Sequence, residues 1–174
     1  MKRVLVTGGA GFIGSHVVER LLDLACVVTV QDDLSTGQAA NLDAVRSRIT
    51  LREGTVSDAL RRGTLDVRAF DTIVHLAANP YVPWSVEDPA HDYAANLATT
   101  FELLEALRLG RSEALLVNIS SGAVYGNPAD PAMREGSPTV PISPYGVSKL
   151  SAERYAEVYS GCFGVRTVSP SRHL

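Results

Sequence analysis

Cysteine, long apolar runs and concentrated positive charge are all scarce in this 174-residue sequence. Its two cysteines, Cys26 and Cys162, have no motif spacing, so we expect neither a disulfide framework nor a metal site, and a reducing cytoplasm is the favoured setting. No stretch of about 20 apolar residues occurs, which argues against a membrane span. The formal net charge of −3 and the lack of a basic stripe do not indicate a nucleic-acid partner.

What the sequence does contain is the alternation of an α/β protein. Hydrophobic residues make up 45% and charged residues 20%, an ordinary balance for one domain, expected over residues 1–174. Short β-rich apolar runs alternate with segments of helical periodicity, which predicts a doubly wound parallel sheet with helices on both faces, the Rossmann fold. The expected strands are residues 3–8, 26–32, 48–54, 70–78, 114–121 and 164–169, the expected helices 14–24, 91–109 and 143–160, and the expected long loops 79–89 and 125–144.

A glycine-rich loop joins the first expected strand to the first expected helix in VLVTGGAGFIGSH. Gly9-x-Gly11-x-x-Gly14 fits the dinucleotide fingerprint, and Gly8-x-x-Gly11-x-x-Gly14 fits its wider-spaced relative. Such glycines allow a tight turn and a close approach of the backbone to a pyrophosphate, which the helix N-terminus attracts. The strand before the loop and the helix after it are the context that the motif requires.

An acidic residue lies about 20 residues beyond this loop, at the end of the second expected strand. A carboxylate at Asp32 would bind an adenosine ribose and repel a 2′-phosphate, and no arginine accompanies it, so NAD is favoured over NADP. The alternative interpretation is a simple glycine turn followed by a solvated pair, Asp32 and Asp33.

A second set of polar residues points to acid–base chemistry. Ser121 follows the fifth expected strand, and Tyr145 and Lys149 lie one turn apart on a helix that Ser143 caps and Pro144 begins. A neighbouring ammonium should favour the phenolate and lower the pKa of Tyr145. By itself the Tyr-x-x-x-Lys spacing is common on amphipathic helices, and only the dinucleotide loop upstream makes it indicative of catalysis.

Together these segments resemble the extended short-chain dehydrogenases/reductases, and among them the NAD-dependent epimerases of nucleotide sugars, the UDP-glucose 4-epimerase group above all. The resemblance covers roughly the first half of a typical member and is carried by TGGAGFIGSH, DDLSTG, HLAA, SSGAVYG and SPYGVSK. It implies Ser121, Tyr145 and Lys149 as catalytic residues. The cofactor-binding residues that it implies are Gly8, Gly11, Phe12, Ile13, Gly14, Asp32, Asp33, Leu34, Ser35, Thr36, Gly37, Thr55, Val56, Leu76, Ala77, Ala78, Asn79 and Asn96, together with Tyr145 and Lys149.

Three residues keep alternative interpretations. Asn96 either lies near the active site, as the resemblance implies, or bonds to a neighbouring backbone. His75 is expected to be a strand residue satisfied by backbone rather than a catalyst. Trp84 either packs its loop or contacts the sugar.

The implied reaction removes hydride from sugar C4 to NAD and returns it to the other face, while Tyr145 takes the proton of the 4-hydroxyl. NAD is regenerated and should be held tightly. Related dehydratases carry an acidic pair where this chain has Gly122 and Ala123, so the resemblance favours a 4-epimerase. The implied partners are a nucleotide sugar, a UDP-sugar in particular, and a second copy of the chain bound through the helices around 91–109 and 144–160.

The sequence departs from the family pattern in two informative places. Thr55 stands where an aspartate usually faces adenine, and Pro170 interrupts the sixth expected strand, because proline removes a ladder donor. Residues 172–174 resemble those just before a family asparagine, so we expect the substrate domain to be absent. The alternatives to an epimerase are therefore a non-catalytic NAD-binding remnant or partner of a full-length relative, and a simple dehydrogenase with an open site.

Overall fold

The computed structural model describes residues 1–127, 134 and 136–170. Within this part of the chain, six parallel strands form one sheet in the order β3-β2-β1-β4-β5-β6. The order reverses between β1 and β4, which is the doubly wound arrangement, and the predicted Rossmann fold is confirmed. The strands are β1 Arg3–Thr7, β2 Val27–Asp32, β3 Ile49–Glu53, β4 Thr72–His75, β5 Leu115–Asn118 and β6 Thr167–Val168.

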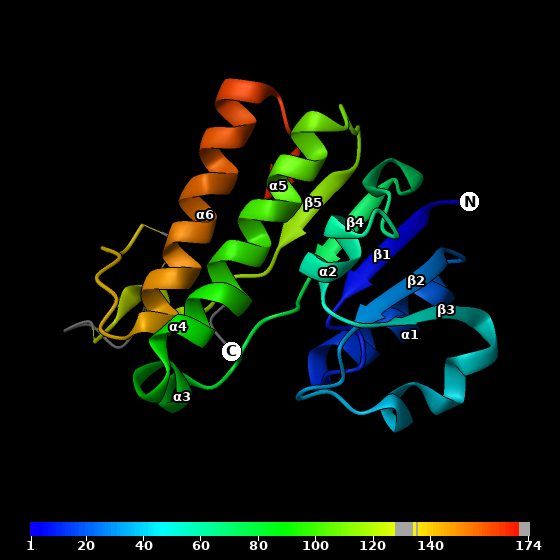
Figure 1. Cartoon of the computed structure of the whole chain (residues 1–174), viewed down its shortest axis with the longest axis horizontal. Helices are drawn as coiled ribbons and strands as arrows, with labels where there is room; N and C mark the ends of the chain where they lie inside the picture. Colours follow the sequence, from blue (N-terminus) through cyan, green and yellow to red (C-terminus); the bar gives the residue numbers. More distant parts are fainter. Residues whose placement is uncertain (128–133, 135, 171–174) are drawn as a thin grey trace.

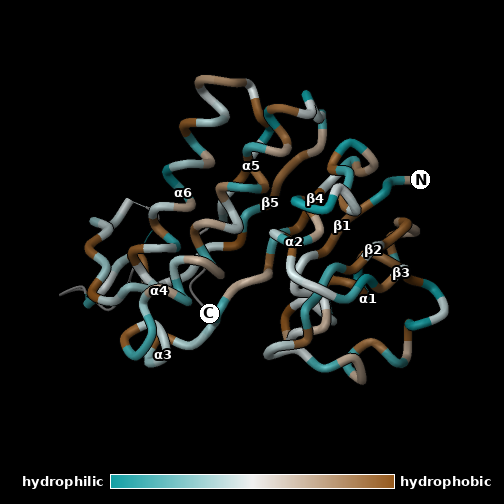
Figure 2. The backbone as a smooth tube through the Cα atoms, viewed as in Figure 1, coloured by the Kyte–Doolittle hydropathy of each residue, from teal (hydrophilic) through white to brown (hydrophobic). Residues whose placement is uncertain are grey.

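Helices pack on both faces of this sheet (Figure 1). One core cluster joins Leu5 and Ile73 of the strands to α2, α5 and α6, and the other joins Val4 and Val6 to α1 and the 3-10 segment η1. The hydropathy colouring shows apolar residues along the central strands (Figure 2). The helical segments are α1 Phe12–Asp23, η1 Ala39–Arg48, α2 Val56–Arg61, η2 Val67–Ala69, α3 Val82–Glu87, α4 Pro89–Asp92, η3 Tyr93–Ala98, α5 Thr99–Leu109, η4 Gly122–Tyr125 and α6 Pro144–Phe163.

The loop expected at 79–89 contains a short helix instead. In α3 the proline at position 83 lies in the first helical turn, where its missing N–H costs nothing, so a residue that indicated a loop helps to start a helix. The helix expected over 91–109 begins at Pro89 under an Asp88 cap and passes through the π-helical segment η3 before α5. The sequence pattern missed η1 and α2 altogether.

The last expected helix and strand correspond to α6 and β6, and the structure gives their boundaries. Ser143 caps α6 by accepting a hydrogen bond from the Gly146 amide at 3.1 Å, as predicted, and α6 ends at Gly164, whose φ of 70° suits the left-handed cap position. β6 has two residues and ends at Val168, before Pro170, which agrees with the predicted interruption. No helix in the described ranges has both the length and the apolarity to cross a membrane.

Candidate active site

The glycine loop between β1 and α1 is shaped by close backbone contacts. Gly8 has φ of 70°, and a Cβ there would lie 2.7 Å from the Ala77 amide nitrogen. A Cβ at Gly14 would collide with the Gly8 carbonyl oxygen, so both positions need glycine. At Gly11 the nearest atom to a Cβ is the same oxygen at 3.3 Å. This geometry agrees with the 8-11-14 spacing and leaves the Gly11 side of the loop open.

The N-terminus of α1 opens onto the same side. Gly11 is its N-cap and provides no side-chain hydrogen bond, so the first-turn amides keep their donors. These donors and the positive end of the helix dipole form a site for an anionic group such as a pyrophosphate. Phe12 and Ile13 are exposed beside it. The loop therefore fits the diphosphate of a dinucleotide.

Asp32 braces this loop from the end of β2. Its buried carboxylate accepts hydrogen bonds from the Ala10 amide at 2.8 Å and from the Leu34 amide at 2.9 Å. Asp33 instead turns to Ser35, whose hydroxyl donates to it at 2.6 Å. The alternative of a solvated Asp32–Asp33 pair is therefore wrong for Asp32. Each Asp32 oxygen keeps a free lone pair with which it can accept from a ribose hydroxyl.

The remaining predicted cofactor contacts follow β2, β3 and β4 at the same edge of the sheet. Gly37 packs on the glycine loop, since a Cβ there would lie 2.9 Å from the Ala10 carbonyl carbon. Thr55 uses its hydroxyl to cap α2, accepting from the Asp58 amide at 3.0 Å, and Val56 lies in the core. The other members of this set are Leu34, Ser35 and Thr36 after β2 and Leu76, Ala77 and Ala78 after β4.

Asn96 joins the π-helical segment to the loop after β4. Its Oδ1 accepts from the Asn79 amide at 2.7 Å, and its Nδ2 donates to the Asn79 carbonyl at 3.3 Å. This is the backbone-bonded alternative for Asn96, and its contact with a cofactor stays a prediction. Asn79 Nδ2 and Ser120 Oγ are buried without a partner among the described residues, a pair of polar atoms that a ligand at this edge could satisfy.

Ser121, Tyr145 and Lys149 meet where β5 ends and α6 begins. Ser121 lies close enough to the Tyr145 phenol to lower its pKa, and the Ser121 Oγ accepts from the Ala123 amide at 3.2 Å. Lys149 is 8% exposed and donates to the Ile119 carbonyl at 3.0 Å. The structure thus assembles the three predicted residues into one centre.

The charge state of this centre differs from the expectation. Burial raises the pKa of Tyr145, the Ser121 hydrogen bond lowers it, and the charge of Asp92 raises it. Burial lowers the pKa of Lys149 to about 8, against the charges of Asp92 and Glu153. The expected lowering of the Tyr145 pKa is wrong in this structure, because burial of the phenol and the charge of Asp92 outweigh the effect of Ser121.

His75 is a neutral structural residue. Its Nδ1 lies 2.7 Å from Thr7 Oγ1 and its Nε2 lies 3.2 Å from Thr100 Oγ1. Burial, with the charge of Lys149, lowers its pKa to about 3. Its partners are threonine hydroxyls and not the expected backbone groups. Trp84 is half exposed and its ring centroid lies 4.6 Å from that of Tyr81, which leaves its contact with a sugar a prediction.

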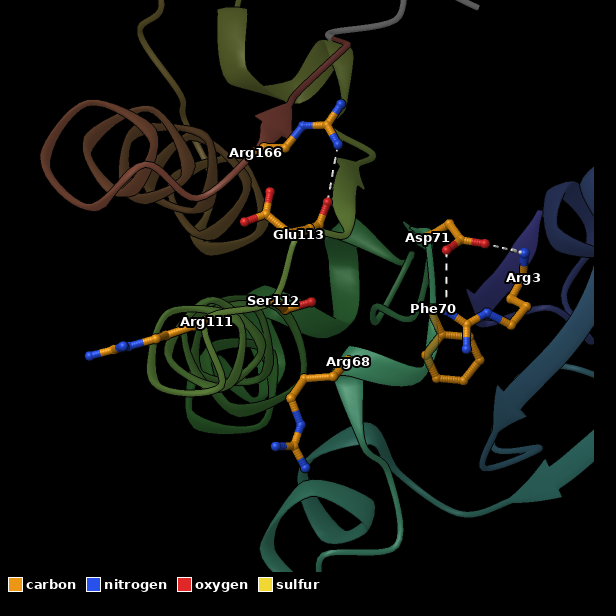
Figure 3. A pocket seen from close by; sticks show the side chains of 8 residues that line it. All are labelled: Arg3, Arg68, Phe70, Asp71, Arg111, Ser112, Glu113 and Arg166. Atoms are coloured by element: carbon orange, nitrogen blue, oxygen red, sulfur yellow. Dashed lines mark hydrogen bonds and ion pairs between the residues drawn. The ribbon is translucent and has the colours of Figure 1, made fainter.

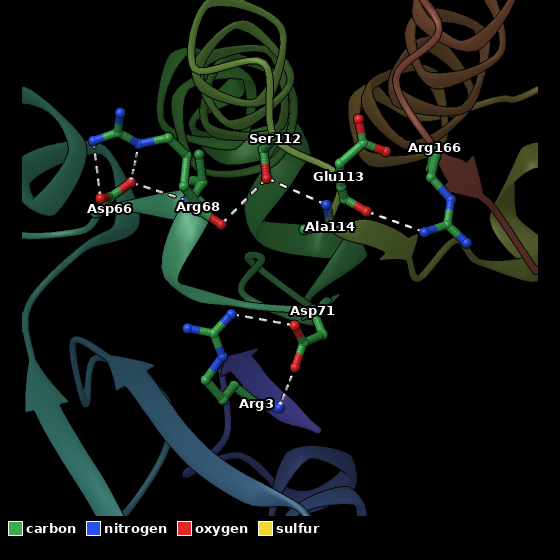
Figure 4. A network of polar contacts seen from close by, with 9 residues as sticks. Arg3, Asp66, Arg68, Asp71, Ser112, Glu113, Ala114 and Arg166 are labelled. Carbon is green, nitrogen blue, oxygen red and sulfur yellow. Dashed lines mark hydrogen bonds and ion pairs between the residues drawn. The ribbon is translucent and has the colours of Figure 1, made fainter. Parts of the chain in front are cut away.

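A pocket of about 430 Å³ lies at the opposite, amino end of the strands and does not belong to this centre (Figure 3). Arg3 pairs with Asp71 at 3.2 Å, and Arg166 donates to the Glu113 carbonyl at 3.1 Å (Figure 4). The Arg111 side chain points away from the other lining residues in Figure 3. These guanidinium groups do not converge on one point, so we assign the pocket no ligand.

Comparison with known families matches residues 4–171 to the family described as NAD dependent epimerase/dehydratase. The chain belongs to this family. It is similar to a UDP-glucose 4-epimerase of Azospirillum brasilense, with 42% identity over 169 residues that make up 95% of this chain and 47% of the relative. It is also similar to a dTDP-glucose 4,6-dehydratase of Mycolicibacterium smegmatis, with 37% identity over 94% of this chain and 50% of the relative.

Solved structures agree with this assignment. The UDP-glucose 4-epimerase of Brucella ovis, determined in complex with NAD, is 38% identical and superposes with a TM-score of 0.88 over 98% of this chain and 51% of that one. The chain spans about half the length of the curated relatives that it matches. The comparisons thus establish the family and the fold.

Proposed function

We propose that this chain is the NAD-binding half of a nucleotide-sugar 4-epimerase of the UDP-glucose/UDP-galactose type. The observation that carries the proposal is that Ser121 after β5, Tyr145 in the first turn of α6 and the buried Lys149 gather at the sheet edge that also holds the glycine loop. Relatives named UDP-glucose 4-epimerase at 34–42% identity support it.

The chain's own residues fit NAD. The uncapped α1 amides would hold the pyrophosphate, and Asp32 would accept from the adenosine ribose. A 2′-phosphate next to the Asp32 carboxylate would be repelled, which favours NAD over NADP. Bound NAD supplies the acceptor for the C4 hydride, and its positive charge would lower the pKa of a neighbouring phenol.

Each side chain of this centre has its own role in a proton transfer. Ser121, which lies beside the Tyr145 phenol, holds the sugar hydroxyl toward it. Tyr145 removes the hydroxyl proton and later returns it. Tyr145 must be a phenolate before it takes this proton, and the positive charge of Lys149 stabilises that phenolate. The half-buried position of Ser121 leaves the centre accessible to substrate from the open edge of the sheet.

An epimerase and a dehydratase differ in the chemistry that accompanies the transfer of the hydroxyl proton. Elimination of water needs a further acid and base near the sugar ring. Gly122 and Ala123 form the start of η4 and provide neither. Since the family also contains relatives named dTDP-glucose 4,6-dehydratase, this local absence of side-chain acids supports epimerisation within it.

A second copy of the chain is the proposed protein partner. Exposed apolar side chains lie along the paired helices α5 and α6, with Phe101 39%, Tyr155 42% and Val158 53% exposed. The Phe101 and Tyr155 rings contact each other at 5.4 Å between centroids, so the patch is continuous across the two helices. Such a surface suits a bundle of four helices between two copies.

The test is conversion of UDP-galactose to UDP-glucose by the purified chain with NAD. We expect Y145F to keep NAD binding and to lose roughly 100-fold or more in rate, as removal of an acid–base group does. Y93F, which removes an exposed phenol outside the centre, should keep the wild-type rate. A stable 4-keto-6-deoxy sugar as product would contradict the proposal.

A non-catalytic NAD-binding partner of a longer relative is the second candidate. It is favoured by the length of the match, about half of each relative, and by the sheet face at Val74 and Val117, where both residues are only half-buried. NAD binding without epimerisation by the isolated chain, restored by adding a relative's remaining half, would favour this candidate.

A further inference from the structure

Asp92 is a carboxylate buried behind the reacting pair. It is the last residue of α4 and has 0% of its surface exposed. Its Oδ2 accepts from Ser148 Oγ at 2.7 Å, and its Oδ1 accepts from Asn96 Nδ2 at 2.7 Å. Ser148 directly precedes Lys149 on α6, so Asp92 ties the helix of the reacting pair to a separate element.

Asp92 also anchors buried hydrogen bonds that reach the sheet. The Asn96 side chain that it holds accepts from the Asn79 amide, and the Asn96 carbonyl accepts from Thr100 Oγ1 at 2.7 Å. Because Thr100 donates its proton to Asn96, it must accept from His75 Nε2, which lies 3.2 Å away. The network therefore fixes the tautomer of neutral His75 and runs unbroken from β4 to α6.

Lys149 interacts through its charge with two members of this network, Asp92 and His75. It is buried, and its ammonium donates to the Ile119 carbonyl rather than to a carboxylate. A buried ammonium requires negative charge nearby, and Asp92 and Glu153 are the carboxylates that raise its pKa against burial. Neutral His75 interacts with the charge of Lys149, and the phenol of Tyr145 interacts with the charge of Asp92.

We infer that Asp92 is a positioning residue for the Tyr145–Lys149 pair: it is the hydrogen-bonded joint between α4 and α6 and, with Glu153, one of two buried carboxylates whose charge acts on the ammonium. The inference rests on the proposed function only in taking Tyr145 and Lys149 as the reacting pair. Its physical consequence is direct. Without the Asp92 charge, Lys149 would lose its proton at a lower pH and would stand neutral beside the phenol.

The sequence offers a clean probe, because Lys2 and Lys149 are its two lysines. Carbon-13 labelling of lysine therefore gives one NMR signal for Lys149 and one internal reference. The variant D92N can keep both hydrogen bonds, since its oxygen can accept from Asn96 and its amide can donate to Ser148. We expect the Lys149 titration midpoint to fall by about one pH unit in D92N, with Lys2 unchanged.

The matched control is D88N, which removes an exposed carboxylate four residues earlier that caps α4 by accepting from the His91 amide. It should leave the Lys149 midpoint in place. An unchanged midpoint in D92N, or an equal fall in D88N, would overturn the inference.

If D92N does not fold, a measurement on the wild-type protein alone tests the inference. In that protein the Asp92 carboxyl carbon signal should move at the Lys149 midpoint, and a signal that stays constant there would overturn the inference. Neither measurement uses NAD or a sugar. Loss of epimerase activity and failure of this inference therefore give different results.

Discussion

At the scale of single residues, Asp32 shows how a binding group is held ready. Its carboxylate accepts from the Ala10 and Leu34 amides, so the charge that would meet a ribose also fixes the glycine loop. The residue type and position follow from the sequence, because strand, glycine loop and acid have a fixed order in dinucleotide folds. The two amide contacts could not be predicted from the sequence, because they depend on how the loop after β2 folds back.

A buried neutral histidine makes a prediction at this same scale. His75 stays unprotonated in the fold down to about pH 3, whereas in the unfolded chain it binds a proton below about pH 6.5. The unfolded state therefore binds more protons, and the contribution of His75 to stability is present above pH 6.5 and is lost as the pH falls toward 3. The loss approaches about 1.4 kcal/mol per pH unit.

Denaturant unfolding between pH 6.5 and about 5.5 measures this loss above the range in which Glu105 of the unfolded chain takes up its proton. H75Q can keep contacts to both threonines and should show a smaller decline with falling pH than the wild type. H91Q, which changes an exposed histidine, should follow the wild type. Equal declines in wild type and H75Q would show that His75 is charged in the fold.

At the scale of elements, long and strongly patterned segments were predictable and short ones were not. The strands β1 to β5, α1 and α6 lie where apolar periodicity placed them, and the Ser143 cap was visible in the sequence. The segments α2 and α3 have six residues each, too few to show a period, and the ten residues of the 3-10 segment η1 bury only Leu42 and Val45. The network around Asp92 was missed as well, although Asp92 and Asn96 stand one helical turn apart, because its partner Ser148 comes from 56 residues away.

The contact between α5 and α6 carries a second prediction. Tyr159 of α6 donates to Glu105 of α5 at 2.7 Å, and Arg108 pairs with the same carboxylate. Y159F removes a hydrogen bond to a charged acceptor and should lower the free energy of unfolding by about 1–2 kcal/mol. E157Q, which breaks an exposed pair with Arg154 on the same helix, should change it little.

The pH dependence of this contact has a definite sign. The Arg108 and Tyr159 hydrogen bonds lower the pKa of Glu105 from 4.5 to about 2. Its contribution to stability is therefore present above pH 4.5 and is lost as the pH falls toward 2. Thermal melts should show this loss for wild type and a weaker one for E105Q. An identical acid profile for both proteins would contradict the assignment.

At the scale of the whole molecule, the proposed dimer places the α5–α6 patch between two copies. V158E would put a charge at an exposed position of this patch and should give a monomer by light scattering at micromolar concentration. L24E, at an exposed leucine after α1, should keep the dimer. A wild-type protein that is monomeric under these conditions would refute the proposed partner.

The glycine loop, Asp32 and the Tyr145 centre all lie at the carboxyl edge of the sheet, where we propose that NAD binds. The most direct measurement is calorimetric titration of NAD and NADP into the purified chain. We expect NAD to bind at one site, NADP to bind at least roughly tenfold more weakly, and D32R to lose NAD while D43R, at an exposed position of η1, retains most of its binding. No binding of NAD to the folded wild-type chain, or a preference for NADP, would contradict the account.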